Sequence, residues 1–107
     1  MNFLVVERDG NLIGCGELRN YKKYSVLVNV FVQQKYRQQK IGSCLVEYIS
    51  YEAKKPLYLC CYNELIPFYT RFGFMVISRQ QVPMELQNEL NLNSNLPIIP
   101  LVLLKNV

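Results

Sequence analysis

The chain has 107 residues, a net charge of +4 and no histidine, so it is long enough for one domain and too short for two. Without histidine a Ser-His-Asp triad is excluded, and four cysteines without a CxxC spacing do not supply the ligands of a zinc site. The 12 Lys and Arg residues are scattered along the chain, which is weak support for a nucleic-acid partner. We expect a single domain over residues 1–107 that needs no metal and binds no nucleic acid.

The sequence also predicts a compartment. It shows no secretory signal pattern, and the apolar run IIPLVLL near its end is too short to cross a bilayer. The cysteines are then expected to be reduced thiols. We therefore expect a cytoplasmic protein without a membrane partner.

The first third of the chain predicts three strands. Apolar runs at about 2–8 and 11–19 flank the pair Asp9-Gly10, which suits a tight hairpin turn with positive φ at both central positions. A Val-rich run at 24–33 follows. Because this run is apolar almost throughout, it predicts a strand covered on both faces.

Helices then alternate with strands. Apolar residues at i, i+3 and i+4 predict a helix over roughly 40–53, which stops before Pro56. A short strand at 56–62 follows. The segment LIPFYTRF predicts a short helix with Pro67 in its first turn and Gly73 as a left-handed cap.

The C-terminal part is less regular. FMVISRQQV predicts a further strand, and the polar stretch after Val82 is compatible with either a short helix or an ordered loop. IIPLVLLKN is a plausible last strand in which Pro100 requires an edge or a bulge. The order β-β-β-α-β-α-β with this possible last strand predicts an α+β fold, a mixed sheet with helices packed on it.

One pattern carries chemistry. In KYRQQKIGSCLVEYI, residues 35–49, Arg37 and Lys40 precede Gly42 at a helix start. The first turn of a helix presents unpaired N–H groups and partial positive charge, and phosphates bind there. Arg and Lys would add charge-assisted contacts. The alternative is an ordinary basic helix start in which Gly42 serves only helix–strand packing.

In the context of these elements, VNVFVQQKYRQQKIGSCLVEYI resembles the acetyl-coenzyme A signature of the GCN5-related N-acetyltransferase (GNAT) superfamily. Downstream, PFYTRFGF resembles the second signature of that family, and the similarity covers roughly residues 3–77. The resemblance implies the GNAT-like acyl-CoA N-acyltransferase fold. It also implies an enzyme that transfers an acetyl group from acetyl-CoA to a primary amine by direct attack in a ternary complex.

The resemblance assigns roles to individual residues. Backbone groups of Phe31 and Val32 would contact the acetyl carbonyl and the pantetheine arm. The pyrophosphate would lie against the loop and helix start, namely Arg37, Gln38, Gln39, Lys40, Ile41, Gly42 and Ser43. Tyr69 matches the tyrosine that protonates the departing thiolate, which a phenol can do because its pKa lies above that of a thiol. Asn63 lies near a family asparagine that contacts the pantetheine, one residue short of the usual spacing.

Three features depart from the family pattern. Lys40 replaces the first glycine of the phosphate loop and is penalised if that position needs positive φ. Tyr24 to Val32 contains no carboxylate to serve as base, which leaves Glu17, a water chain or an amine that arrives neutral. The chain starts at the hairpin, so the acceptor groove would be open, built by a second subunit or closed by residues 83–107. This favours a homodimer.

Other interpretations stay open. The absent base and the substituted glycine favour a non-catalytic coenzyme A sensor or interaction module, whereas a nucleic-acid binder rests on charge alone. Gly14 and Gly16 form a GxG on a strand, which is more typical of a bulge than of a phosphate site. Cys60 or Cys61 could be transiently acylated near the thioester, although small buried packing residues are the simpler interpretation.

Overall fold

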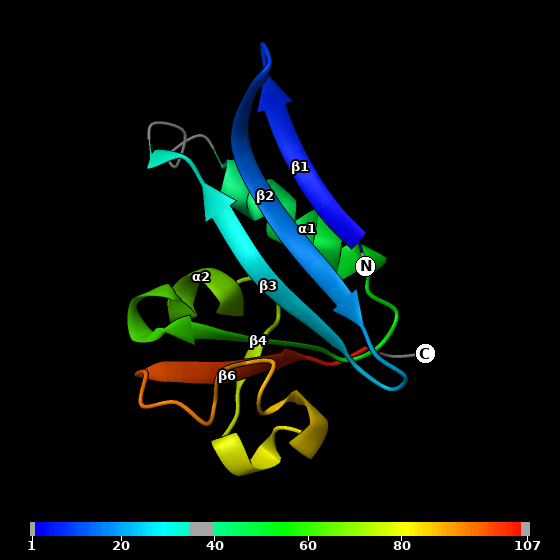
Figure 1. The fold of residues 1–107 in the computed structure, drawn as a ribbon, viewed down its shortest axis with the longest axis vertical. Helices are drawn as coiled ribbons and strands as arrows, with labels where there is room; N and C mark the ends of the chain where they lie inside the picture. The colour runs from blue at the N-terminus through cyan, green and yellow to red at the C-terminus, as the bar shows by residue number, and fades with distance from the viewer. Residues whose placement is uncertain (1, 35–39, 106–107) are drawn as a thin grey trace.

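The computed structural model describes residues 2–34 and 40–105 (Figure 1). Its strands and helices follow the predicted order and confirm the α+β class. They are β1 (Asn2–Arg8), β2 (Asn11–Asn20), β3 (Ser25–Val32), α1 (Ile41–Glu52), β4 (Leu57–Tyr62), α2 (Ile66–Thr70), β5 (Met75–Val76) and β6 (Ile98–Leu103). Single 3-10 turns lie at η2 (Asn63–Leu65), η3 (Arg79–Gln81) and η4 (Met84–Leu86).

The strands form one six-stranded mixed sheet in the order β1-β2-β3-β4-β6-β5. Every neighbouring pair is antiparallel except β3 and β4, which are parallel. The β3–β4 ladder contains only the pairs Ser25–Leu57 and Val26–Tyr58. Beyond these pairs the two strands diverge, and the sheet opens between them (Figure 1).

The β1–β2 hairpin turns as the sequence predicts. Asp9 and Gly10 have φ values of 52° and 80°. Positive φ at both central positions matches the right-handed twist of the flanking strands. The register of β1 and β2 follows from this turn.

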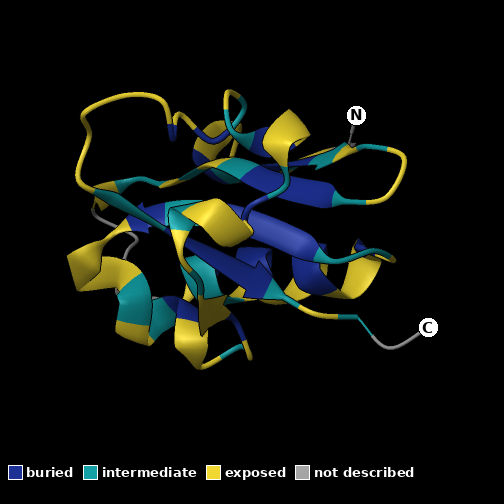
Figure 2. Cartoon of the chain, turned by 90° about the horizontal axis from the view of Figure 1, so that it is seen from below, coloured by how far each residue is buried: buried dark blue, intermediate teal, exposed yellow. Residues whose placement is uncertain are grey.

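The sheet is covered differently on its two faces, and the buried residues concentrate in the central strands (Figure 2). On one face α1 packs Val46 and Ile49 against Leu18 and Leu27. The other face, over β3, β4 and β6, is covered by residues 82–92, whose buried side chains are Val82, Leu86, Leu90 and Leu92. Among the residues that the structure describes, no helix is both long and apolar enough to cross a membrane.

The prediction that the third strand is covered on both faces is wrong for its second half. Ser25 to Leu27 are buried, but Asn29 and Phe31 are exposed, the latter by 46%. The reason is the tertiary packing of other segments on β3. Residues 82–92 cover only the start of β3, whereas α1 continues along the other face.

The predicted strand FMVISRQQV is also mostly wrong. Only Met75 and Val76 pair as β5, after which a capping box at Ser78 and Gln81 begins η3. The Gln81 side chain accepts the Ser78 N–H at 2.8 Å, so a local partner replaces a strand partner. After Val82 the chain forms an ordered loop with one 3-10 turn.

β6 exists as predicted, but it is not an edge strand, because β4 flanks it on one side and β5 on the other. Pro100 is opposite Cys60, and its carbonyl accepts the Ile77 N–H from the β5 side. In a strand, the backbone N and C=O of one residue point to the same neighbouring strand. Since the Pro100 carbonyl points to the β5 side, the Pro100 nitrogen also points there, at a position beyond the end of β5. The longer β4 ladder keeps its hydrogen bonds.

Candidate active site

The start of α1 is the predicted pyrophosphate site, and its described backbone is compatible with binding an anion. Lys40, the N-cap residue, has φ 61° and ψ 20°, and its side chain makes no capping hydrogen bond. This position therefore does need the left-handed conformation, which costs a non-glycine residue about 1–2 kcal/mol. No acidic side chain lies in the first turn, where Ile41, Gly42 and Ser43 present their N–H groups. Arg37, Gln38 and Gln39 lie outside the described residues.

Packing does not explain Gly42. A Cβ there would lie 3.7 Å from Val32 Cγ2 and 3.7 Å from Phe68 Cζ, which are ordinary van der Waals distances. The helix start thus has room for a side chain that the sequence leaves out, as expected where a ligand approaches the backbone. The nearness of Gly42 to Val32 and Phe68 places the first turn of α1 between the end of β3 and α2.

Gly14 and Gly16, in contrast, have a packing role. A Cβ on Gly16 would lie 2.8 Å from Ile49 Cδ1, and one on Gly14 would lie 3.1 Å from Leu45 Cδ1. Both residues therefore let α1 pack closely on β2. The GxG motif belongs to the core and not to a phosphate site.

β3 carries a bulge before the predicted acetyl-binding residues. Its register against β2 shifts from Cys15–Phe31 to Glu17–Val28, so β3 has one extra residue. Asn29 has φ 56°, a left-handed conformation that asparagine tolerates better than most residues. Phe31 and Val32 lie beyond the bulge, where β3 has left its ladder with β4. Their role in holding an acetyl group stays a prediction.

A cleft of about 640 Å³ occupies the opening between β3 and β4. It is lined by residues 27–30 of β3, 59–62 of β4, Tyr69 of α2 and, from the C-terminal segment, residues 88–91, Leu96 and Ile98. The C-terminal segment therefore supplies one wall, which is one of the three arrangements that the sequence left open. Asn63 is exposed at the start of η2 and does not line the cleft.

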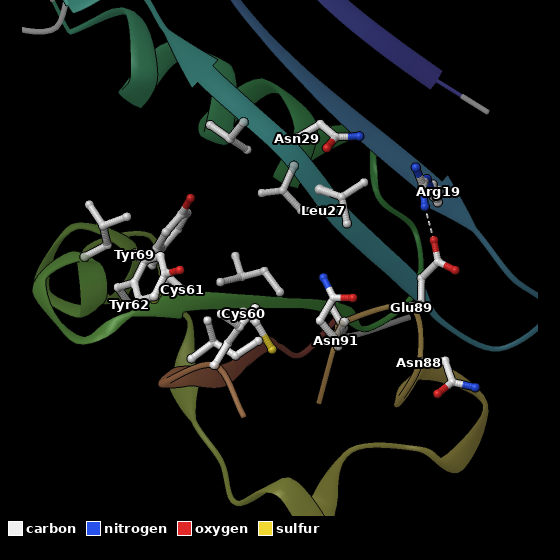
Figure 3. Close-up of a pocket in the computed structure, with 17 residues that line it drawn as sticks. Arg19, Leu27, Asn29, Cys60, Cys61, Tyr62, Tyr69, Asn88, Glu89 and Asn91 are labelled. Carbon is white, nitrogen blue, oxygen red and sulfur yellow. Dashed lines mark hydrogen bonds and ion pairs between the residues drawn. The ribbon is translucent and has the colours of Figure 1, made fainter. Parts of the chain in front are cut away.

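Tyr69 is suited to donate a proton. Its side chain is only 7% exposed, and its hydroxyl extends from α2 toward β3 (Figure 3). Burial, with a smaller contribution from Cys61, raises the pKa of Tyr69 to about 12. Edge-to-face contacts with Phe68 and Phe74, at centroid distances of 5.0 and 5.9 Å, hold the ring.

The cysteines beside Tyr69 are poor nucleophiles. Cys60 and Cys61 both line the cleft. Burial raises the pKa of Cys60 to about 12 and also raises the pKa of Cys61. Because the thiolate is the reactive form, these values support the packing role over transient acylation.

Glu17 is engaged elsewhere. It is 3% exposed, accepts hydrogen bonds at 2.8 Å from Arg19 Nε and from Asn29 Nδ2, and does not line the cleft. The hydrogen bond from Arg19, followed by that from Asn29, lowers the pKa of Glu17. A carboxylate stabilised in this way accepts a proton poorly, which argues against Glu17 as the base.

Sequence reasoning missed two charged residues of the cleft, Arg19 and Glu89. They form an ion pair between β2 and the segment after η4 (Figure 3). The two residues are 70 positions apart, and the segment around Glu89 has no clear periodicity. No local pattern could have indicated this contact. Within residues 2–34 and 40–105, no group of His, Cys, Asp and Glu side chains could hold a metal ion.

The sheet topology, the diverging parallel strands and the cleft define an acyl-CoA N-acyltransferase fold. The chain matches a family model described as an acetyltransferase (GNAT) domain over residues 1–76. The protein therefore belongs to the GNAT acetyltransferase family, which confirms the resemblance of the two signatures. A search of curated proteins finds no match.

Solved structures show the same fold. N-acetylglutamate synthase from Neisseria gonorrhoeae, complexed with coenzyme A and N-acetyl-glutamate, is similar with a TM-score of 0.83 and 21% identity, over 98% of this chain and 26% of that one. Rv2747 from Mycobacterium tuberculosis, in complex with CoA and NLQ, has a TM-score of 0.78 and 20% identity over 97% and 76% of the two chains. A GNAT-family acetyltransferase from Staphylococcus aureus has a TM-score of 0.71 and 23% identity over 97% and 67%. The chain spans about a quarter of the synthase.

Proposed function

We propose that the protein transfers an acetyl group from acetyl-CoA to a primary amine. The observation that carries this proposal is the buried hydroxyl of Tyr69 in the cleft beside the start of α1. Gly42 in the first turn of α1 is next to Phe68, and Tyr69 follows in α2. The proposed pyrophosphate site and the proposed proton donor thus lie on adjoining elements.

In the proposed reaction the amine nitrogen attacks the thioester carbonyl carbon directly. A C–N bond forms, the C–S bond breaks, and the leaving thiolate takes the Tyr69 proton, which a phenol with a pKa of about 12 retains until then. Backbone N–H groups of β3 near Val32 would stabilise the oxyanion. Holding both substrates in one cleft supplies proximity. The attacking amine is neutral, either because it arrives so or because water takes the ammonium proton, since Glu17 is engaged by Arg19 and Asn29. After the C–N bond forms, the nitrogen releases a further proton to water, and the Tyr69 phenolate takes a proton back from water.

A coenzyme A sensor is the second candidate. The engagement of Glu17 favours it, because the cleft then lacks the carboxylate that the sequence offered as a base. In this case the cleft would bind the cofactor without turnover. The N-acetyl-glutamate bound in the similarly folded synthase supports instead a small-molecule amine as acceptor.

Calorimetric titration with acetyl-CoA is the first test, and absence of binding at millimolar ligand would reject both candidates. Thiol release is then measured over a panel of amines. Tyr69→Phe should lower kcat by about 10²- to 10⁴-fold and leave acetyl-CoA affinity unchanged. Tyr62→Phe is the matched control, because Tyr62 lines the same cleft from β4.

Two results would change the proposal. Full activity of Tyr69→Phe would remove Tyr69 as the acid, and binding without transfer to any amine would favour the sensor.

The homodimer and the cytoplasmic location are proposals too. Since residues of the C-terminal segment line the cleft, that wall does not require a second subunit. Sedimentation at micromolar protein tests the dimer.

A further inference from the structure

A polar network connects the β3 bulge with the wall of the cleft. Asn29 Nδ2 donates to Glu17 at 2.8 Å, and Arg19 donates to Glu17 through Nε at 2.8 Å and Nη2 at 3.3 Å. Arg19 Nη1 also pairs with Glu89 (Figure 3). The network therefore joins β2, β3 and the segment after η4.

The charges in this network do not cancel. Arg19 already pairs with Glu17 through two of its nitrogens, so the Glu89 carboxylate leaves an excess of one negative charge. Glu89 and Arg19 are the charged side chains among the described residues that line the cleft. Arg79, on the same segment, also carries a positive charge, but its guanidinium donates to backbone carbonyls and it does not line the cleft. The excess negative charge is therefore local to the surface around Glu89.

Glu89 lies on a segment that contacts within the chain hold in place. The guanidinium of Arg79 donates to the carbonyls of Leu92, Leu96 and Ile98 at 2.7, 3.1 and 3.2 Å. Leu90, next to Glu89, is 4% exposed. A carboxylate on such a fixed segment needs little reorganisation to receive a ligand.

Glu89 interacts with one further titratable group, Tyr21. Burial, followed by a hydrogen bond with Glu89, raises the pKa of Tyr21. The neutral phenol adds no charge, and the amides of Asn88 and Asn91 line the cleft on either side of Glu89. The excess negative charge is therefore not compensated by these neighbours.

We propose that this wall selects cationic acceptors: the cleft takes an amine that carries a second ammonium group, and it discriminates against an amine that carries a carboxylate. Glu89 is the specificity-determining residue, and Glu17 and Arg19 are positioning residues. A second ammonium gains an ion pair with Glu89. A carboxylate meets like charge, and Arg19 has no unmatched charge to offer it.

This inference rests on the proposed function, and the test separates the two. The probes are 1,5-diaminopentane and 5-aminopentanoate, which have chains of equal length and differ in the charge of the second group. With acetyl-CoA saturating, kcat/KM for the diamine should be about tenfold higher, equivalent to about 1.4 kcal/mol. Glu89→Gln should remove most of this preference through the KM of the diamine, with acetyl-CoA affinity unchanged.

Glu85→Gln is the matched control, because Glu85 is exposed in η4 of the same segment and does not line the cleft. A preference for aminopentanoate, equal rates, or an unchanged ratio in Glu89→Gln would overturn the inference and leave the transferase function intact. If neither amine is acetylated, each is titrated into the coenzyme A-saturated protein. Tighter binding of the diamine then supports the inference without the transferase, and equal or absent binding overturns it.

Discussion

Two regions line the same cleft and are built in different ways. The region that we propose as the donor side comprises β3, α1 and, with Tyr69, α2, which are regular strands and helices. The region that we propose as the acceptor side, residues 79–98, has two 3-10 turns as its regular elements before β6 begins at Ile98. Nevertheless Leu86 in this segment is fully buried, like Val46 in α1.

The difference shows how an irregular segment becomes well defined. In α1 the backbone satisfies its own polar groups. In residues 79–98 side chains do so: Arg79 donates to three carbonyls, and Gln87 Nε2 donates to the carbonyls of Arg79 and Val82 at 2.9 and 3.1 Å. Backbone carbonyls withdrawn from water need a partner, and for these largely part-buried carbonyls the partners are a few specific side chains. The acceptor side should therefore depend on single residues more than the donor side does.

The largest effect is expected for Arg79→Ala. It leaves three carbonyls without their donor and should cost about 2–3 kcal/mol of unfolding free energy, since hydrogen bonds to charged groups are among the stronger ones. Urea denaturation measures the loss. Acceptor KM should rise while acetyl-CoA affinity stays constant. Arg79→Lys, which keeps the charge and loses the planar fork, should be intermediate. A loss below about 0.5 kcal/mol would show that the buried leucines alone hold the segment.

The second comparison sets Gly16→Ala against Gly42→Ala on the donor side. Gly16→Ala overpacks Ile49 and should destabilise by about 1–3 kcal/mol. Gly42→Ala fits its surroundings and should stabilise α1 by about 0.5–1 kcal/mol. If a ligand needs the space, the same change weakens coenzyme A binding. Thermal melts and calorimetry on both variants test the pair, and destabilisation by Gly42→Ala would return this glycine to a packing role.

Acid stability tests the link between the two sides. The pKa of Glu17 lies below its ordinary value of 4.5 in the folded state. Its interactions therefore stabilise the native protein above that ordinary value, and the contribution is lost as the pH falls through the folded-state pKa. Glu17→Gln should be less stable than the parent at pH 7, with the two curves converging at low pH. Glu47→Gln, on an exposed position of α1, is the control. Parallel curves would contradict the assignment.

The smallest effect is expected at Lys40. Its left-handed backbone is part of the fold of the chain, so we expect its strain to be a cost of folding and not of binding. Lys40→Gly should change stability by no more than about 1 kcal/mol, since relief of strain is offset by the entropy of glycine. A change in the coenzyme A affinity of Lys40→Gly then measures the contribution of the Lys40 ammonium group to binding. Lys40→Gln removes the charge and keeps the strain. Equal affinity losses in both variants would support a charge role, whereas tighter binding by Lys40→Gly would contradict it.

Most of the donor side could be predicted from the sequence. The Asp9-Gly10 hairpin, the strand before α1, α1 itself and the Pro67 helix lie within one or two residues of their expected places, apart from the shorter end of α2. Turn residues and apolar periodicity act over a few positions, so these elements are visible locally. The strand expected through Ser78 failed because a local capping box replaced sheet pairing.

The sequence by itself determined the order of elements, the family and the candidate roles of Gly42 and Tyr69, because these depend on short-range patterns. Tertiary structure alone decided three other features. It placed residues of the 88–98 segment along the cleft and paired Arg19 with Glu89. It also engaged Glu17 with Arg19 outside the cleft, which argues against Glu17 as a base. Each of these depends on side chains from segments far apart in the chain, which are brought together by the burial of Leu86, Leu90 and Leu92 against the sheet. Contacts of that kind leave no local period in the sequence.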